Sequence, residues 1–189
     1  MDALDDRSLW TASLAGDGRA FGVIFERHRD RVFRALRRGA PTATDAEDLT
    51  AVVFLELWRR RGDARMVDGT LLPWLLVTAG NVARNANRAR RRYTGFLAAL
   101  PRPEPQPDFA DDATGRLDAG AASAALQSSL DALPEVDRHL LVLTAIEGFS
   151  LTEASSALGI GYNAAKTRLS RARSKLRTAH PELSPLEAS

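Results

Sequence analysis

Residues 150–177 read SLTEASSALGIGYNAAKTRLSRARSKLR, and this stretch predicts two helices joined by a short turn. A capping box, Ser150 with Glu153, begins the first helix, and Gly159 is expected to end it. The second helix, expected over 163–177, is strongly basic. A helix, a glycine-containing turn and a basic helix are typical of a helix-turn-helix, in which the second helix enters the major groove of duplex DNA.

The basic helix is predicted to have one buried and one exposed face. Its small and apolar residues fall within about 60° of one another and form the expected buried stripe: Ala165, Leu169, Ala172 and Leu176. Amide, hydroxyl and cationic side chains occupy the opposite face and its flanks. We expect these residues to contact DNA: Asn163, Lys166, Thr167, Ser170 and Arg171. The alternative is a solvated basic face without a ligand.

The segments on either side of this stretch also have helical periodicity, and strand-like alternation is absent. The expected helices cover 6–15, 18–38, 44–60 and 72–92 in a first lobe, and 119–130, 134–147, 151–158 and 163–177 in a second. Thr44 with Glu47 is expected to cap the third helix, and Pro73 suits the first turn of the fourth. The predicted fold class is all-α, with two small helical domains, the C-terminal one carrying the helix-turn-helix.

A proline-rich and acidic segment separates the two lobes. Prolines alternate from Pro101 to Pro107, and three acids follow at Asp108, Asp111 and Asp112. Such a composition cannot pack a core and is typical of an extended, flexible linker. The expected boundaries are therefore 1–98 for the first domain, 99–118 for the linker, 119–180 for the second domain and 181–189 for a tail.

The composition excludes several classes of protein. The chain has 189 residues, of which 44% are hydrophobic and 26% charged, as in ordinary globular proteins. It has no cysteine, and its three histidines are isolated, so neither a metal site nor a cofactor is expected. No apolar run is long enough to span a bilayer, and the first residues are acidic, so the expected location is the cytoplasm, without membrane insertion.

The helix over 72–92 has a second face of the kind that binds nucleic acid. An aromatic side chain, amides and guanidinium groups share an arc about 80° wide along the helix. These residues are Trp74, Thr78, Asn81, Asn85, Arg88 and Arg92. They could supply a stacking plane, hydrogen bonds to exposed base edges and charge for the backbone of unpaired DNA. The alternative is that Trp74 packs in the core.

The helix over 44–60 is apolar on more than one side. One stripe suits the core, and another face combines exposed aliphatic residues with charges: Asp48, Ala51, Val52, Leu55 and Arg59. This second face suggests a protein partner, although scattered surface leucines are common. In the preceding helix, His28 lies within the apolar stripe and is expected to be a buried histidine with a satisfied hydrogen bond.

Five motifs together resemble one family. They are Asp45-Ala-Glu-Asp-Leu-Thr through Trp58-Arg-Arg60, Pro73-Trp-Leu-Leu through Asn85, Leu133-Pro-Glu, Leu151-Thr-Glu-Ala and Lys166-Thr-Arg-Leu-Ser-Arg-Ala172. This order of motifs, with a linker between the lobes, resembles the extracytoplasmic-function group of bacterial sigma factors. The resemblance implies a dissociable initiation subunit of RNA polymerase that has no enzymatic activity of its own.

The resemblance also implies roles for the surfaces described above. The face from Asp48 to Arg59 would bind the beta-prime clamp of core RNA polymerase, and the helix from Trp74 to Arg92 would melt and read the minus-ten element of promoter DNA. The loop over 62–72 would hold an extruded base. The second lobe would read the minus-thirty-five element as duplex and meet the beta flap, and the acidic linker would pass through the polymerase cleft. An anti-sigma factor is a further partner that the family suggests.

Two departures from the family pattern bear on these roles. Ala51 and Val52 stand where the family usually has a glutamine and an acid, so the expected contact with the clamp is more apolar. The recognition helix opens with Asn163-Ala-Ala165 instead of a Gly-Thr-Val-like run, so the family's sequence preference does not carry over.

Two other functions are compatible with parts of the sequence. A free-standing helix-turn-helix repressor or activator accounts for residues 133–177 but leaves the faces of the first lobe unused. A ribosome-binding or RNA-binding helical protein accounts for the arginines but not for the turn before the last helix. Both would bind nucleic acid without polymerase.

Overall fold

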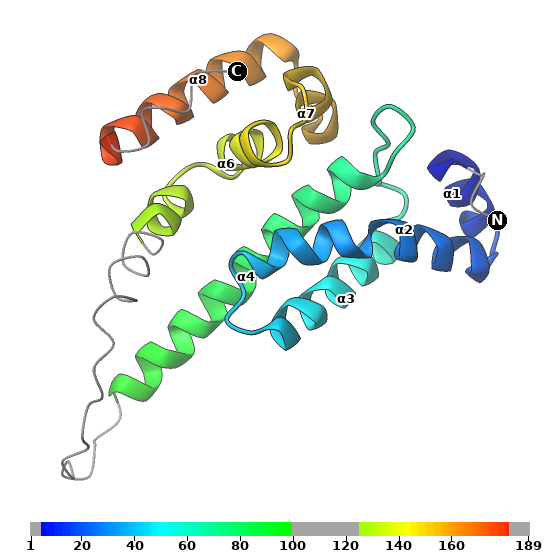
Figure 1. Ribbon diagram of the computed structural model, residues 1–189, viewed down its shortest axis with the longest axis horizontal. Coiled ribbons are helices and arrows are strands. Elements are labelled where there is room, and N and C mark those ends of the chain that lie inside the picture. The colour runs from blue at the N-terminus through cyan, green and yellow to red at the C-terminus, as the bar shows by residue number, and fades with distance from the viewer. Residues whose placement is uncertain (1–4, 100–124, 182–189) are drawn as a thin grey trace.

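The computed structural model describes residues 5–99 and 125–181, and helix is the regular structure throughout these ranges. The first lobe contains α1 (Asp6–Leu14), α2 (Gly18–Arg37), α3 (Ala43–Arg59) and α4 (Leu72–Ala99). The second lobe contains a helical segment over 125–131, then α6 (Glu135–Leu141), the π-helical turn η1 (Val142–Ile146), α7 (Leu151–Leu158) and α8 (Tyr162–Ala179). The predicted all-α, two-lobed fold is confirmed (Figure 1).

Local capping begins and ends several of these helices. The Ser150 hydroxyl accepts from the backbone N–H of Glu153 at 3.2 Å, and the Glu153 carboxylate accepts from the Ser150 N–H at 2.7 Å, which confirms the predicted capping box. Gly159 ends α7 with φ +66°, the left-handed conformation that favours glycine.

The cap of α3 lies two residues before the predicted one. Thr42 Oγ1 accepts from the Asp45 N–H at 3.0 Å, and the Asp45 carboxylate accepts from the Thr42 N–H at 3.1 Å. Thr44, predicted to be the cap, is already inside the helix. Aspartate served as the acidic partner here, so the pattern that requires glutamate or glutamine at the third position missed the true cap.

Two helices differ from their expected lengths. The helix predicted over 134–147 is α-helical only to Leu141 and then widens into η1, where the Glu147 N–H donates to the Val142 carbonyl at 3.0 Å. The Thr144 hydroxyl donates to the Leu140 carbonyl at 2.7 Å and competes for the acceptor of the α-helical ladder. In the first lobe, α4 continues to Ala99, seven residues beyond its predicted end at residue 92.

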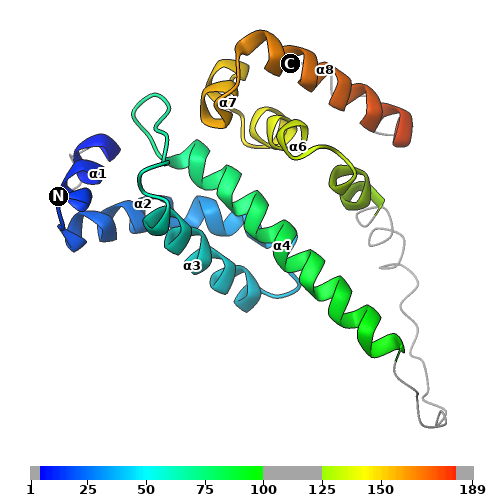
Figure 2. The same ribbon diagram turned by 180° about the vertical axis from the view of Figure 1, so that it is seen from behind.

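The described residues form two hydrophobic cores, and the second contains residues of both lobes. Ile24, Val53, Leu57 and Leu75 belong to the first core and are fully buried among α1 to α4. The second core is built mainly from α6, η1, α7 and α8, but it also contains Val67 and Leu76 of the first lobe. In both ribbon views α6 and α7 lie on the opposite side of α4 from α3, and α2 crosses α4 (Figures 1 and 2).

The two lobes approach each other closely at two glycines, which have no side chain to separate them. A β-carbon on Gly80 of α4 would lie 3.0 Å from Nε2 of His139 in α6. A β-carbon on Gly159 would lie 1.6 Å from Nη1 of Arg65, because the Arg65 guanidinium lies directly against the glycine backbone. A larger side chain at Gly80 would require the buried His139 ring to shift, whereas at Gly159 the flexible Arg65 guanidinium would have to move aside.

Candidate nucleic-acid and polymerase interface

The recognition helix α8 divides as the sequence predicts. Ala165 and Ala172 are fully buried and Leu169 is 7% exposed, so the expected core stripe is confirmed. The five residues expected to contact DNA are all exposed: Asn163, Lys166, Thr167, Ser170 and Arg171. In both ribbon views α8 lies on the far side of α6 from α4 (Figures 1 and 2). The face suited to base edges and phosphates is therefore open to solvent.

Side-chain contacts hold α8 in place on the rest of the second lobe. Arg168 Nη1 donates to the buried carboxylate of Asp137 in α6 at 3.0 Å. At the other end of the helix, Ser129 and His180 hydrogen-bond at 2.8 Å. Sequence reasoning grouped the cations of this helix as phosphate ligands and missed that Arg168 ties the recognition helix to α6.

The predicted strand-opening face of α4 is only partly exposed. Trp74 and Thr78 are 7% and 8% exposed, and Trp74 belongs to the first core, the alternative considered for it. Asn81 is half-buried, whereas Asn85, Arg88 and Arg92 are exposed. The difference follows from position along α4, because its first turns pack inside the lobe and its later turns extend past α2 and α3 (Figure 1).

A groove of about 730 Å³ runs between α3 and α4 and joins two of the predicted faces. Val52 and Arg60 line it from α3 and the turn that follows, and Asn81, Asn85 and Arg88 line it from α4. Amides and guanidinium groups therefore converge beside apolar side chains, and the carboxylates of Glu56 and Glu135 also line the groove. Such a groove can accept an unpaired nucleotide strand along α4.

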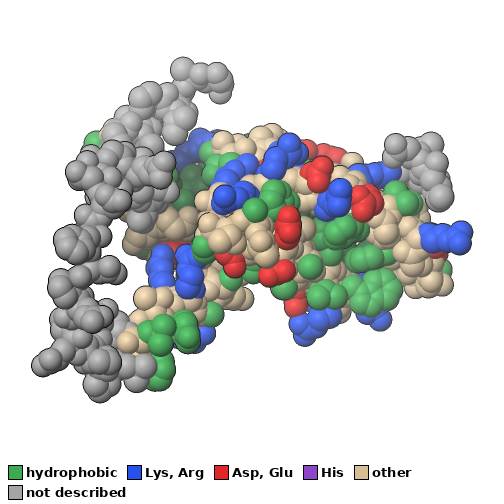
Figure 3. All heavy atoms as spheres, turned by 60° about the horizontal axis from the view of Figure 1, so that its bottom comes forward, with side chains coloured by type: hydrophobic (Ala, Val, Ile, Leu, Met, Phe, Trp, Pro, Cys, Tyr) green, Lys and Arg blue, Asp and Glu red, His purple; other side chains and the backbone are tan. Residues whose placement is uncertain are grey.

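The second predicted face of α3 is exposed over its whole length. All five of its residues are exposed: Asp48, Ala51, Val52, Leu55 and Arg59, with Val52 at 41% and Leu55 at 61%. Trp58, also 41% exposed, adds an aromatic side chain that the sequence analysis missed. In Figure 3, hydrophobic side chains gather among charged ones on this side of the molecule. Exposed aliphatic and aromatic side chains of this kind mark a protein-binding surface.

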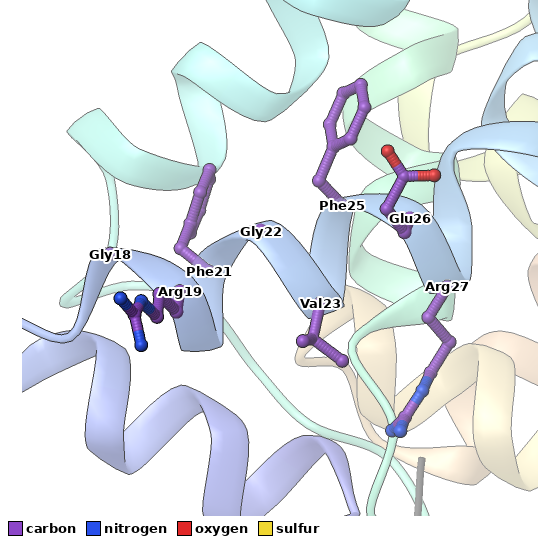
Figure 4. A pocket seen from close by; sticks show the side chains of 8 residues that line it. All are labelled: Gly18, Arg19, Phe21, Gly22, Val23, Phe25, Glu26 and Arg27. Atoms are coloured by element: carbon purple, nitrogen blue, oxygen red, sulfur yellow. The ribbon is translucent and has the colours of Figure 1, made fainter. Parts of the chain in front are cut away.

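A second hollow, of about 900 Å³, lies along α2. Figure 4 shows Phe21 and Phe25 pointing to one side of α2, and Val23 and Arg27 to the other. Phe21 packs edge-on against Trp58 of α3 with ring centroids 5.5 Å apart, and Phe25 packs against Phe54 at 4.7 Å. These rings pack α2 against α3.

The loop before α4 ends in a tight hairpin. The backbones of Val67 and Thr70 exchange two hydrogen bonds of 3.0 Å, with positive φ at Asp68 and Gly69. Asp-Gly at these positions is typical of a two-residue turn with left-handed conformations. The loop that the family resemblance associates with an extruded base is therefore an ordered structure.

A buried carboxylate, Asp6 of α1, contacts this loop and α2 together. Asp6 is 3% exposed and accepts hydrogen bonds from Arg27 at 2.8 Å, His28 at 2.6 Å, the Thr70 hydroxyl at 2.9 Å and the Leu71 N–H at 2.9 Å. Burial alone would raise the pKa of Asp6, but the hydrogen bonds from His28, Leu71 and Arg27 and the charge of His28 hold it well below its usual range. The prediction that His28 is a buried, satisfied histidine is confirmed.

Two buried basic residues of α6 have no hydrogen-bond partner for their terminal nitrogens. The atoms without a partner are the two Nη atoms of Arg138 and Nε2 of His139, and His139 lies at the contact with α4. Burial, followed by the charge of Arg138, lowers the pKa of His139 to about 4. A cavity of about 160 Å³ borders them between the lobes. Neither residue was found from the sequence.

Three acidic residues that the sequence analysis assigns to the linker lie outside the described residues. Asp108, Asp111 and Asp112 fall between the two described ranges. Within 5–99 and 125–181, no group of three or more histidine, aspartate or glutamate side chains is placed to hold a metal ion. No helix among these residues is long and apolar enough to cross a bilayer.

The fold and its exposed faces define a two-lobed helical protein with a helix-turn-helix and a separate exposed apolar surface on α3. Residues 24–93 match the family "Sigma-70 region 2", and residues 123–176 match "Sigma-70, region 4".

Full-length relatives extend the match over both lobes. The RNA polymerase sigma factor CarQ of Myxococcus xanthus is 34% identical over 168 residues, which cover 87% of this chain and 91% of CarQ. The RNA polymerase sigma factor CnrH of Cupriavidus metallidurans is 32% identical over 176 residues, covering 90% and 92%. The solved structure of CnrH in complex with the cytosolic domain of CnrY has a TM-score of 0.58 and 27% identity, and covers 94% of this chain and 98% of CnrH.

The chain belongs to the extracytoplasmic-function sigma factors of bacterial RNA polymerase. As a sigma factor it binds core RNA polymerase and promoter DNA and directs transcription initiation. Sigma factors are initiation factors, so the function of this chain lies in its binding surfaces.

Proposed function

We propose that the two lobes read two physical states of the same promoter. The observation that carries this proposal is the division of α8, whose buried stripe leaves Asn163, Lys166, Thr167, Ser170 and Arg171 exposed on one face. A helix-turn-helix with such a face reads duplex DNA in the major groove, which corresponds to the minus-thirty-five element.

The exposed part of α4 is proposed to open and read the minus-ten element. Asn81, Asn85 and Arg88 line the groove beside α3, and Arg92 continues the same face. Amides can bond base edges that become accessible only after strand separation, and the arginines can hold the backbone. Trp74 and Thr78 are buried and act in this proposal by fixing the start of α4 in the lobe.

The polymerase contacts are proposed at two places. The face formed by Asp48, Ala51, Val52, Leu55 and Arg59 would bind the beta-prime clamp, and its exposed Val52 and Leu55 support an apolar contact. The second lobe would meet the beta flap. The linker over 99–118, which joins domain 1–98 to domain 119–180, would pass through the cleft of the polymerase, and residues 181–189 would form a tail. Since the polymerase acts in the cytoplasm, we place the chain there as well.

A protein inhibitor of the anti-sigma class is a further proposed partner. CnrH, which the chain resembles over nearly its full length, was solved in complex with the cytosolic domain of another protein. The exposed apolar surface of α3 is a surface that such a partner could cover.

A gel shift of promoter DNA with and without core polymerase tests this function. The chain alone should bind duplex promoter weakly, and the complex with core polymerase should bind it tightly and specifically. Tight, sequence-specific binding by the chain alone would favour a free-standing helix-turn-helix regulator. Binding of RNA in preference to promoter DNA would favour an RNA-binding protein.

A further inference from the structure

We propose that Asp6 is a positioning residue for promoter reading, because it fixes the loop over 62–71 in the conformation that receives an unpaired base. This inference rests on the proposed function of the first lobe in minus-ten recognition, in which the loop would hold an extruded base, as the family resemblance implies. Asp6 itself is buried, so it acts through the loop and not by touching DNA.

The carboxylate of Asp6 joins the loop to the rest of the first lobe. Its Oδ2 atom accepts from His28, from the Thr70 hydroxyl and from the Leu71 N–H, while Oδ1 accepts from Arg27. Two of these donors come from α2 and two from the end of the loop. One side chain of α1 thereby bonds His28 of α2, 22 residues further along the chain, and Leu71 of the loop, 65 residues further along.

The hydrogen bonds continue into the start of α4. The Leu72 N–H donates to Thr70 Oγ1 at 3.2 Å, and the same hydroxyl donates to Asp6. Leu71 is fully buried in the first core. The last two loop residues and the first residue of α4 are therefore tied directly or through one hydroxyl to Asp6, which sets where the hairpin of Val67 and Thr70 sits relative to α4.

A buried carboxylate is expensive to desolvate and is seldom retained for stability alone. Here the carboxylate joins two donors of α2, Arg27 and His28, to two donors at the end of the loop, Thr70 and Leu71. Because the amides of α4 and the loop must act on the same nucleotide strand, a shift of the loop by a fraction of an ångström would misplace a base without unfolding the lobe.

The test uses the full chain with core polymerase on a premelted promoter bubble that carries each of the four bases in turn at the unpaired upstream positions. Thr70→Val removes one hydroxyl at nearly constant volume, and Thr70→Ser is its matched control because it keeps the hydroxyl. Asp6→Asn keeps the shape of the side chain and removes its charge. The base preference is the ratio between the best and the worst base, measured both as transcript yield and as the lifetime of the complex.

Wild type and Thr70→Ser should discriminate equally, whereas Thr70→Val should lose about fivefold and Asp6→Asn about tenfold of that preference. The double variant should be no worse than Asp6→Asn alone, since both changes break one network. Affinity for core polymerase and for a duplex minus-thirty-five probe should stay within about twofold of wild type, as expected for changes far from α8 and from the exposed face of α3.

Undiminished base preference in folded Thr70→Val and Asp6→Asn chains would overturn the positioning role and leave the loop's proposed role intact. A wild-type chain without base preference on the bubble would overturn the proposed role of the loop, and with it this inference. If Asp6→Asn fails to fold, the comparison of Thr70→Val with Thr70→Ser decides, because Thr70 is only half-buried and loses a single hydroxyl.

Discussion

Arg31 of α2 and Glu147, 116 residues apart in the sequence, form a charged contact that joins the two lobes. Arg31 Nε donates to Glu147 Oε2 at 2.9 Å, and its Nη2 donates to the Glu147 backbone carbonyl at 2.9 Å. Arg38 Nη1 donates to the other carboxylate oxygen at 2.5 Å. The Glu147 side chain is 1% exposed, and both cations that pair with its carboxylate among residues 5–99 and 125–181 belong to the other lobe.

Glu147→Gln should loosen the contact between the lobes. The amide keeps the shape but loses the charge that pairs with Arg31 and Arg38, which we expect to shift the equilibrium towards separated lobes by about 1–3 kcal/mol. The chain has no cysteine, so cysteines introduced at the exposed Glu47 and Ser174 can carry two fluorophores. Energy transfer should fall in the variant. Glu56→Gln, which breaks a pair within α3, is the control, and equal transfer in both variants would contradict the prediction.

Acidification should weaken the same contact through His139. Burial lowers the pKa of His139 to about 4 from its ordinary value near 6.5, so the open or unfolded chain binds the proton more tightly than the closed form. The stabilisation is therefore fully present above about pH 6.5 and is lost as the pH falls towards 4, by up to about 3 kcal/mol.

The charged groups around His139 do not reverse this sign. Arg138 and Arg84 lower its pKa further, and Glu135 raises it by less than burial lowers it. Energy transfer and thermal midpoint should both fall between pH 6.5 and 4, and His139→Gln should remove that dependence. Asp6, whose pKa is depressed, contributes stability that is lost only below about pH 4, so its effect falls outside this window. A pH-independent profile in the wild type would contradict the assignment to His139.

Substitutions on α8 should weaken closed-complex formation and spare DNA opening. Arg171→Ala and Lys166→Ala remove exposed cations and should reduce duplex binding by about 1–3 kcal/mol where a base edge is read, and by less where only phosphate is held. Arg173→Ala, also exposed on α8 but outside the predicted base-reading set, is the matched control. Gel shifts with polymerase on minus-thirty-five variants measure the loss.

Substitutions on α4 should have the opposite effect. Asn81 and Asn85 line the groove beside α3. Asn81→Ala and Asn85→Ala should therefore spare duplex binding and reduce the permanganate reactivity of unpaired thymines near the start site. A premelted bubble should rescue them only in part, since it does not restore amide contacts to bases. If these variants open DNA normally and Arg171→Ala fails to open DNA that it has already bound, the roles of the two lobes are exchanged.

Charge on the exposed face of α3 should abolish binding to core polymerase. Val52→Asp with Leu55→Asp places two carboxylates in an apolar contact, and both positions are exposed, so helical content should be unchanged. Leu14→Asp, at an equally exposed leucine of α1, is the control. Pull-down with core polymerase and far-ultraviolet circular dichroism separate loss of binding from loss of folding. Wild-type core affinity in the double variant would show that the clamp contact lies elsewhere.

The features that the sequence predicts correctly are those with local causes. The Ser150 and Glu153 capping box, the left-handed Gly159 and the buried stripe of α8 each depend on residues within a few positions of one another, where spacing alone dictates geometry. The exposed face of α3 follows from the same periodicity. Its position next to the amides of α4, across one groove, depends on how the two helices pack.

Tertiary structure decided the features that depend on long-range packing. Trp74 and Asn85 lie on one predicted face of α4, but only the tryptophan is buried, because the other helices cover the first turns and not the later ones. In the sequence, nothing distinguishes Asp6 from the other acids near the start of the chain. In the structure, Thr70 and Leu71 of the loop donate hydrogen bonds to it. Glu147 likewise gains its cations from α2, more than 100 residues earlier. Sequence periodicity determines which side chains share a face, whereas the three-dimensional packing of distant segments determines what covers that face and pairs with its charges.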